Sequence, residues 1–101
     1  MNSYETLYAI KPTLEEEERA ALIARFAGII ADNGGEVENT DEWGMRKLAY
    51  SIHYKNEGDY ADGYYVLVNF KAPSELPAEL ERNFKITDAV MRFIVVRKDE
   101  K

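Results

Sequence analysis

The stretch "MRKLAYSIHYKNEGDYADGYYVLVNFK", residues 45–71, decides the fold that we expect for this chain. It holds two segments in which apolar and polar residues alternate, a pattern typical of strands with one buried face. The polar run "NEGDYADG", residues 56–63, lies between them and predicts a turn. Together with "EVENTDEW" before it, the first segment predicts one long strand bent near Gly44, since glycine within a strand often marks a bend or bulge.

A helix is predicted before this pair of strands. The run "TLEE" fits a capping box in which Thr13 is the N-cap and Glu16 reaches back to it. Apolar residues then recur at helical spacing through residues 22–30, which predicts one buried stripe. The sequence "NGG", residues 33–35, predicts the end of the helix because glycine accepts a left-handed conformation.

A second helix is predicted after the strands. Ser74 is its expected N-cap, and Pro77 fits the first turn, where no backbone donor is needed. Leu76, Leu80 and Phe84 recur every four residues and predict its buried face.

The two ends of the chain each supply a further strand, at residues 3–10 and 89–96. The resulting order, β-α-β-β-α-β, is that of the split βαβ or ferredoxin-like fold. We therefore expect an α+β domain over residues 1–97, with a four-stranded antiparallel sheet, two helices on one face and a short charged tail at residues 98–101.

Alternation along the strands predicts which side chains face the helices. The expected helix-facing residues are Thr6, Tyr8, Ile10, Tyr64, Val66, Val68, Phe70, Met91, Phe93 and Val95. The opposite face then receives an apolar patch, and contiguous exposed apolar patches mark binding surfaces. Its members are Leu7, Tyr65, Leu67, Ile94 and Val96, and we predict that a protein partner binds at Leu7, Tyr65, Leu67 and Ile94.

The chain lacks the residues that catalysis or cofactor binding would need. It has no cysteine, and its one histidine, His53, has no companion metal ligands at a recognisable spacing. No glycine-rich phosphate loop precedes a helix. The acidic run at residues 15–18 fits a helix start, where the helix dipole stabilises carboxylates. We expect no enzyme activity, no metal and no cofactor.

The charge balance is acidic, yet basic residues gather near the bend. The chain has 13 Lys and Arg against 19 Asp and Glu, giving a formal charge of −6. Charge repulsion is screened over about 10 Å at 0.1 M salt, so a local basic group can still bind phosphate. Candidate phosphate-binding residues are Arg46, Lys47, Lys55 and Arg92, although solvated surface side chains remain an equal alternative.

Base stacking of the RNA-recognition-module type is not predicted. That module needs a basic residue and alternating aromatic residues on its third strand. Here Asp62 stands at the basic position, and Tyr65 is the only aromatic residue that we place on the open side.

The chain resembles the bacterial small-subunit ribosomal proteins of the S-six family over nearly its full length. The most specific likeness is "WGMRKLAYSI", residues 43–52, which is similar to that family's W/L-G-x-R-x-L-A-Y-P-I run, with Ser51 in place of Pro. The runs "NGGEV", "GYYVLV" and "DAVMRFIVVR" follow in the family's order.

This resemblance implies a non-catalytic ribosomal protein with the split βαβ fold, located on the ribosome in the cytoplasm. It implies a heterodimer with the small basic ribosomal protein of the S-eighteen family, bound to the central domain of small-subunit ribosomal RNA. The N-terminus lacks a signal-peptide pattern and no window is apolar enough for a membrane span, in keeping with that location. The alternative is a ferredoxin-like homodimer that senses a small molecule, because fold alone does not fix function.

Overall fold

The computed structural model describes residues 1–54 and 58–98, with the backbone alone described for residues 49–54 and 59. The order of its elements is β1 (Asn2–Ile10), α1 (Glu16–Asp32), β2 (Glu36–Tyr54), β3 (Gly58–Ala72), α2 (Leu76–Ile86) and β4 (Val90–Arg97). The predicted β-α-β-β-α-β order is confirmed.

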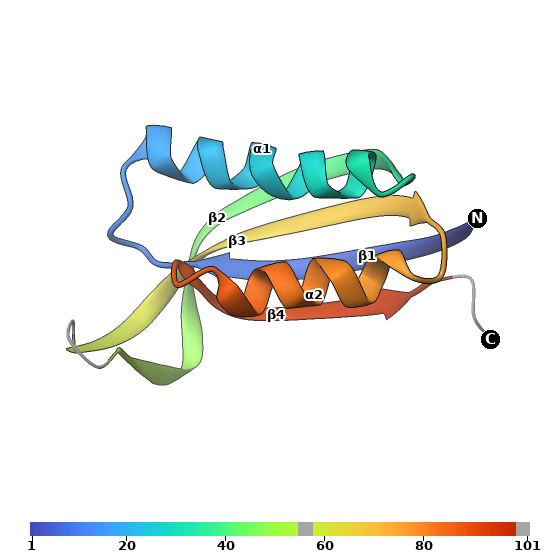
Figure 1. The fold of residues 1–101 in the computed structure, drawn as a ribbon. Helices are drawn as coiled ribbons and strands as arrows, with labels where there is room; N and C mark the ends of the chain where they lie inside the picture. Colours follow the sequence, from blue (N-terminus) through green and yellow to red (C-terminus); the bar gives the residue numbers. More distant parts are fainter. Residues whose placement is uncertain (55–57, 99–101) are drawn as a thin grey trace.

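The strands form one sheet in the order β2-β3-β1-β4, and every neighbouring pair is antiparallel. Both helices lie on one face of this sheet and run in opposite directions (Figure 1). The other face has no helix over it, and we call it the open face (Figure 1). The predicted α+β class with one covered face is therefore confirmed.

Aromatic rings form the centre of the core between the helices and the sheet. The Tyr8 ring centroid lies 5.2 Å from that of Phe26 and 5.0 Å from that of Phe84. Phe84 in turn lies 4.7 Å from Phe26 and 5.1 Å from Phe93. These distances are those of favourable aromatic pairs, so β1, β4 and the two helices are joined at one point.

Helix α1 begins two residues later than the sequence pattern indicates. Thr13 is not the N-cap. Glu15 is extended at φ −74° and ψ 161° and takes that position, with its backbone N–H donating to Glu18 Oε1 at 3.2 Å. The preceding segment is tied to the β4 side, since the Lys11 N–H donates to the Ala89 carbonyl at 2.9 Å. With Lys11 held at this position, the first helical turn begins only after Thr13.

The predicted end of α1 is confirmed. Gly34 has φ +86°, the left-handed conformation that glycine accepts without strain. Its N–H donates to Ala31, and the Gly35 N–H donates to the Ile30 carbonyl at 2.8 Å. This pair of bonds is the Schellman motif, which satisfies the last carbonyls of the helix.

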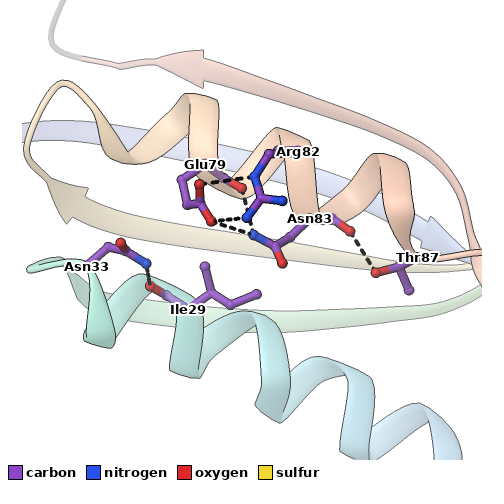
Figure 2. A network of polar contacts seen from close by, with 6 residues as sticks. All are labelled: Ile29, Asn33, Glu79, Arg82, Asn83 and Thr87. Carbon is purple, nitrogen blue, oxygen red and sulfur yellow. Dashed lines mark hydrogen bonds and ion pairs between the residues drawn. The ribbon is translucent and has the colours of Figure 1, made fainter.

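Helix α2 also begins one residue later than predicted, with Glu75 rather than Ser74 at the N-cap. Figure 2 shows the polar contacts that follow along it: Arg82 donates to Glu79 at 2.6 Å, Asn83 Nδ2 donates to the Glu79 carbonyl at 2.8 Å, and Thr87 Oγ1 donates to the Asn83 carbonyl at 2.7 Å. The hydrogen bond from Arg82 lowers the pKa of the Glu79 carboxyl. These contacts run from the exposed Arg82 to the buried Asn83 and Thr87.

β3 begins at Gly58, so most of the turn predicted at residues 56–63 is strand instead, and residues 56 and 57 lie outside the described residues. Residues 58–60 pair with residues 52–54 of β2, and the β2–β3 ribbon projects beyond the other two strands (Figure 1). Residues 58–60 thus form a strand through antiparallel backbone pairing, although their composition has a low strand propensity.

Met91 does not face the helices as predicted. The pairing of β1 with β4 shifts between Ala9 and Ile10, so that Ile10 lies opposite Val90 and Ala9 opposite Arg92. The extra residue is Met91, whose sulfur lies 3.5 Å from where a Cβ on Gly63 would stand. A bulge of this kind reverses the direction of the side chain that it adds.

Candidate nucleic-acid and partner interface

The open face is organised in rows of residues that lie directly opposite one another on neighbouring strands. In one row Leu67 lies opposite Leu7, which lies opposite Ile94. Ile94 is 57% exposed and Val96, two residues further along β4, is 43% exposed. Together with the half-buried Tyr65, these side chains make a contiguous apolar surface. The structure therefore brings together the four residues predicted to bind a protein partner.

The adjacent row is interrupted by a small residue. Tyr65 lies opposite Ala9, and Ala9 lies opposite Arg92. Ala9 itself is fully buried, and a hollow lies beside it in this row. This hollow, which we call the slot, has a volume of about 250 Å³ and is lined by Leu7, Ala9, Tyr65, Arg92, Phe93 and Ile94.

Trp43 extends this row on the β2 side. The register between β2 and β3 shifts at this residue, between Glu42 and Gly44, and Gly44 has φ +83°. The bulge places the Trp43 ring against Tyr65, with centroids 6.4 Å apart and planes inclined by 17°. Sequence alternation missed this second aromatic residue of the open face, and the glycine beside it was the only signal.

Arg46 covers Trp43. Its guanidinium carbon lies 5.6 Å from the centroid of the indole ring, within the range of a cation–π contact. Its Nε also donates to the Trp43 carbonyl at 3.4 Å. From β2 to β4 the open face thus presents a guanidinium, an indole, a phenol, the slot and a second guanidinium, that of Arg92.

The four predicted phosphate-binding residues do not form one patch. Arg46 and Arg92 both lie on the open face, on either side of the slot. Lys47 follows Arg46 in the strand and pairs with Asp62, so it points to the opposite face. Lys55 lies outside the described residues.

Charge is divided unequally between the two faces. The strand register places on the open face the cations Arg46, Lys71, Arg92 and Lys98 and the anions Glu5, Glu36, Glu38 and Asp41, which balance in charge. Lys71 and Glu38 pair at 3.6 Å. The first turn of α1, in contrast, is a run of carboxylates at residues 16–18. The negative net charge of the chain is therefore concentrated away from the open face.

Exposed polar contacts join the covered face of the β2–β3 ribbon to α1. The Tyr64 hydroxyl donates to Glu42 Oε1 at 2.7 Å, and the guanidinium of Arg19 lies 4.0 Å above the Tyr64 ring. The hydrogen bond to Glu42 raises the pKa of the Tyr64 hydroxyl. These contacts hold the strand that carries Trp43 against the first helix.

Over the residues that the structure describes, no group of three potential metal ligands comes together. Neither helix in the described part of the chain has the length and apolar content needed to cross a membrane. The groups that the open face does offer are guanidinium, aromatic and aliphatic side chains.

Comparison with known proteins identifies the family. The sequence profile described as Ribosomal protein S6 matches residues 3–97. The chain belongs to the ribosomal protein S6 family. This confirms the resemblance to the S-six family, whose members are structural proteins of the small ribosomal subunit on the cytoplasmic ribosome and not enzymes.

Relatives in the ribosomal protein S6 family match the whole chain. The small ribosomal subunit protein bS6 of Thermoanaerobacter pseudethanolicus is 55% identical over 99% of this chain and 100% of its own length. The bS6 protein of Clostridium novyi is 56% identical with the same coverage. The crystal structure of 30S ribosomal protein S6 from Thermotoga maritima superposes with a TM-score of 0.85 at 30% identity, covering 96% of this chain and 87% of that one.

Proposed function

We propose that this chain binds the central domain of small-subunit ribosomal RNA as a heterodimer with the basic ribosomal protein of the S-eighteen family. The observation that carries the proposal is the open face, which combines an apolar surface with two exposed guanidinium groups. Apolar area supports a protein contact and guanidinium groups support phosphate contacts, so both kinds of partner can be accommodated.

The proposed RNA contacts are made by Arg46, Lys47, Lys55 and Arg92. Arg46 and Arg92 lie on the open face, and Lys47 on the other side of the β2–β3 ribbon. Cations on both sides of a projecting ribbon suit insertion between two RNA backbone segments, because phosphate contacts fix register and orientation. Lys55 follows Tyr54 in the sequence, outside the described residues.

The proposed protein contact is made by Leu7, Tyr65, Leu67 and Ile94. A partner rich in Lys and Arg would gain from the charge of −6 on this chain through faster encounter. The apolar row would then supply the area buried in the complex.

A small-molecule-sensing homodimer has less support. The slot measures about 250 Å³, below the roughly 300–1,000 Å³ typical of small-molecule sites. It is lined by one charged side chain, Arg92, and otherwise by apolar and aromatic residues. It suits a single flat group better than an entire metabolite.

Filter binding of a central-domain ribosomal RNA fragment tests the proposal. Titrations would compare the chain alone, the chain with its basic partner, and the partnered double variant Arg46→Ala/Arg92→Ala, at several salt concentrations. We expect tight binding only with the partner, and a slope of log affinity against log salt that is shallower by about 1–2 in the double variant. Absence of binding in the presence of the partner would contradict the function. Unchanged binding by the double variant would contradict the role of these two residues.

A further inference from the structure

We propose that a small cluster of side chains, at the point where the β2–β3 ribbon leaves the sheet, positions the two guanidinium groups assigned to RNA binding. The cluster consists of Leu48, Gly63 and Met91, and we call it the ribbon cluster. Its members are positioning residues that act through Arg46 and Arg92. This inference rests on the proposed function. It uses none of the residues assigned to the protein partner, so both roles operate in the same complex.

Side chains from three strands converge on one point above the backbone of Gly63 in β3. A Cβ on Gly63 would lie 3.3 Å from the Cβ of Ala9 in β1. The same point lies 3.5 Å from Leu48 Cδ2 in β2 and 3.5 Å from Met91 Sδ in β4. A glycine within a strand often marks a place where neighbouring groups approach the backbone closely. All four strands of the sheet therefore meet at this glycine.

The ribbon cluster lies on the open face, apart from the core beneath the helices. Gly63 stands two residues before Tyr65 in β3, and residues two apart in a strand share a face. Leu48 is 9% exposed and Ala9 is fully buried, yet neither belongs to the buried cluster that packs against the helices. The burial of Leu48 therefore comes from the side chains of β1 and β4 that converge over Gly63.

The backbone ladder is interrupted at the same level of the ribbon. The register of β2 against β3 shifts between Lys47 and Ile52. Residues 48–51 therefore lie opposite residue 61 alone. Extra residues in one strand bend that strand and break the ladder locally. Because ladder hydrogen bonds do not fix the angle of the ribbon at this bend, we infer that the packing of Leu48 fixes it.

Both arginines are attached to this cluster through short stretches of backbone. Arg46 lies opposite Gly63 and stands two residues before Leu48. Arg92 directly follows Met91. The same contacts thus hold β2 just beyond the first guanidinium and β4 just before the second. Groups that are already held in place lose less freedom on binding, which favours affinity.

Spin-label distances test the positioning without RNA. The chain has no cysteine, so two introduced cysteines can be labelled specifically. Asp59→Cys places a nitroxide on the ribbon, and Lys85→Cys places one at an exposed position of α2. We expect double electron–electron resonance to give a narrow distance distribution, and a broader one when Met91→Ala is added. Met91→Leu conserves the side-chain volume and should restore the narrow distribution.

Filter binding of central-domain RNA by the partnered complex is the second readout. Met91→Ala is expected to weaken the affinity by about 2- to 13-fold, because ordering the ribbon now opposes binding. The salt slope should stay unchanged, since both arginines remain. In the Arg46→Ala/Arg92→Ala background, Met91→Ala should have little further effect, because residues that act through one another are not additive. Gly63→Ala, whose Cβ would crowd that of Ala9, should weaken binding in the same way and serves if Met91→Ala does not fold.

Ile23→Ala is the matched control, at a half-buried position of α1 that packs against the helix-side core. It should lower stability in urea and leave the label distances and the RNA affinity unchanged. The inference is overturned if Met91→Ala leaves either the distance distribution or the RNA affinity unchanged, or if its effect on affinity persists without the two arginines. Absence of RNA binding by the unmodified partnered complex would contradict the proposed function, whereas binding that Met91→Ala does not weaken would contradict this inference alone.

Discussion

At the scale of single residues, the buried hydroxyl of Tyr8 lowers the stability of the folded state. Its side chain is 1% exposed, and its hydroxyl has no hydrogen-bond partner among the residues that the structure describes. An unsatisfied buried polar group costs about 1–3 kcal/mol. Burial also raises the pKa of this hydroxyl, with the nearby Glu42 charge adding to the effect.

Tyr8→Phe is therefore expected to raise the free energy of unfolding by about 1–3 kcal/mol, measured by urea denaturation. Tyr4→Phe is the control, because the Tyr4 hydroxyl accepts a hydrogen bond from Asn2 at 3.3 Å and its removal should bring no gain. Since the folded-state pKa of Tyr8 is raised above its ordinary value of 10.0, stability should fall as pH rises above that value, and Tyr8→Phe should remove this part of the fall. A less stable Tyr8→Phe would show that the hydroxyl has a partner.

Two glycines give opposite expectations for the same substitution. A Cβ on Gly35 would lie 2.8 Å from both Ile30 Cγ2 and Leu76 Cδ1, so Gly35→Ala should lower stability by about 1–3 kcal/mol through overpacking. A Cβ on Gly28, within α1, would meet nothing within 4 Å. Gly28→Ala should therefore raise stability by about 0.5–1 kcal/mol because alanine is the better helix former. Thermal denaturation of both variants checks the pair, and equal effects would contradict it.

At the scale of elements, periodicity located every helix and strand, but the ends of several elements were predicted wrongly. Thr13 and Ser74 have the residue types of N-caps, yet a cap is used only where the backbone enters the helix. The backbone bond from Lys11 to Ala89 decides that entry for α1, and it joins segments nearly eighty positions apart in the sequence. Contacts of such separation are invisible to a local pattern, so propensity is overridden there.

Removing the contact that does form at the start of α1 should matter more than removing the predicted one. Glu18→Ala deletes the acceptor of the Glu15 N–H and is expected to lower stability by about 0.5–1 kcal/mol. Thr13→Ala should change it by less than about 0.5 kcal/mol, as at an ordinary surface position. Paired urea titrations make the comparison, and a larger loss for Thr13→Ala would restore the cap predicted from the sequence.

The candidate site depends on two bulges, and that is why the sequence indicated only part of it. Strict alternation correctly placed Leu7, Tyr65, Leu67 and Ile94 together, because their strands pair without interruption over those residues. Trp43 lies where the register of β2 shifts, and alternation cannot say which face an added residue takes.

Gly44→Ala tests the bulge at β2. At φ +83° an alanine is strained, and the cost should be about 1–2 kcal/mol although no atom obstructs the added methyl group. Because the strain is relieved by moving the bulge, the fluorescence of Trp43, the only tryptophan, should shift as its contact with Tyr65 is lost. An unchanged emission spectrum together with unchanged stability would contradict this role for Gly44.

At the scale of the whole molecule, the separation of charge predicts different effects for acids and bases. Glu16→Gln/Glu17→Gln reduces the negative charge in the first turn of α1, on the covered side of the sheet. We expect slightly tighter RNA binding at low salt with an unchanged salt slope, because no phosphate contact is gained. Arg92→Gln should instead make the slope shallower by about 0.7–0.9. Filter binding of the partnered complex over a salt series measures the salt slope of each variant. Equal slopes for the two variants would contradict the proposed separation of charge between the faces.

The central position of β1 in the sheet affects how the protein folds during its synthesis. β1 lies between β3 and β4, so the first strand to leave the ribosome has as one neighbour the last strand to be synthesised. Until residues 90–97 emerge, one edge of β1 has no strand beside it, and Tyr8 and Phe84 lack the cover of Phe93. Unpaired strand edges and exposed apolar rings are what chaperones bind and what drives misassembly. A protein of the ribosome is thus made with its own sheet open until β4 has been synthesised.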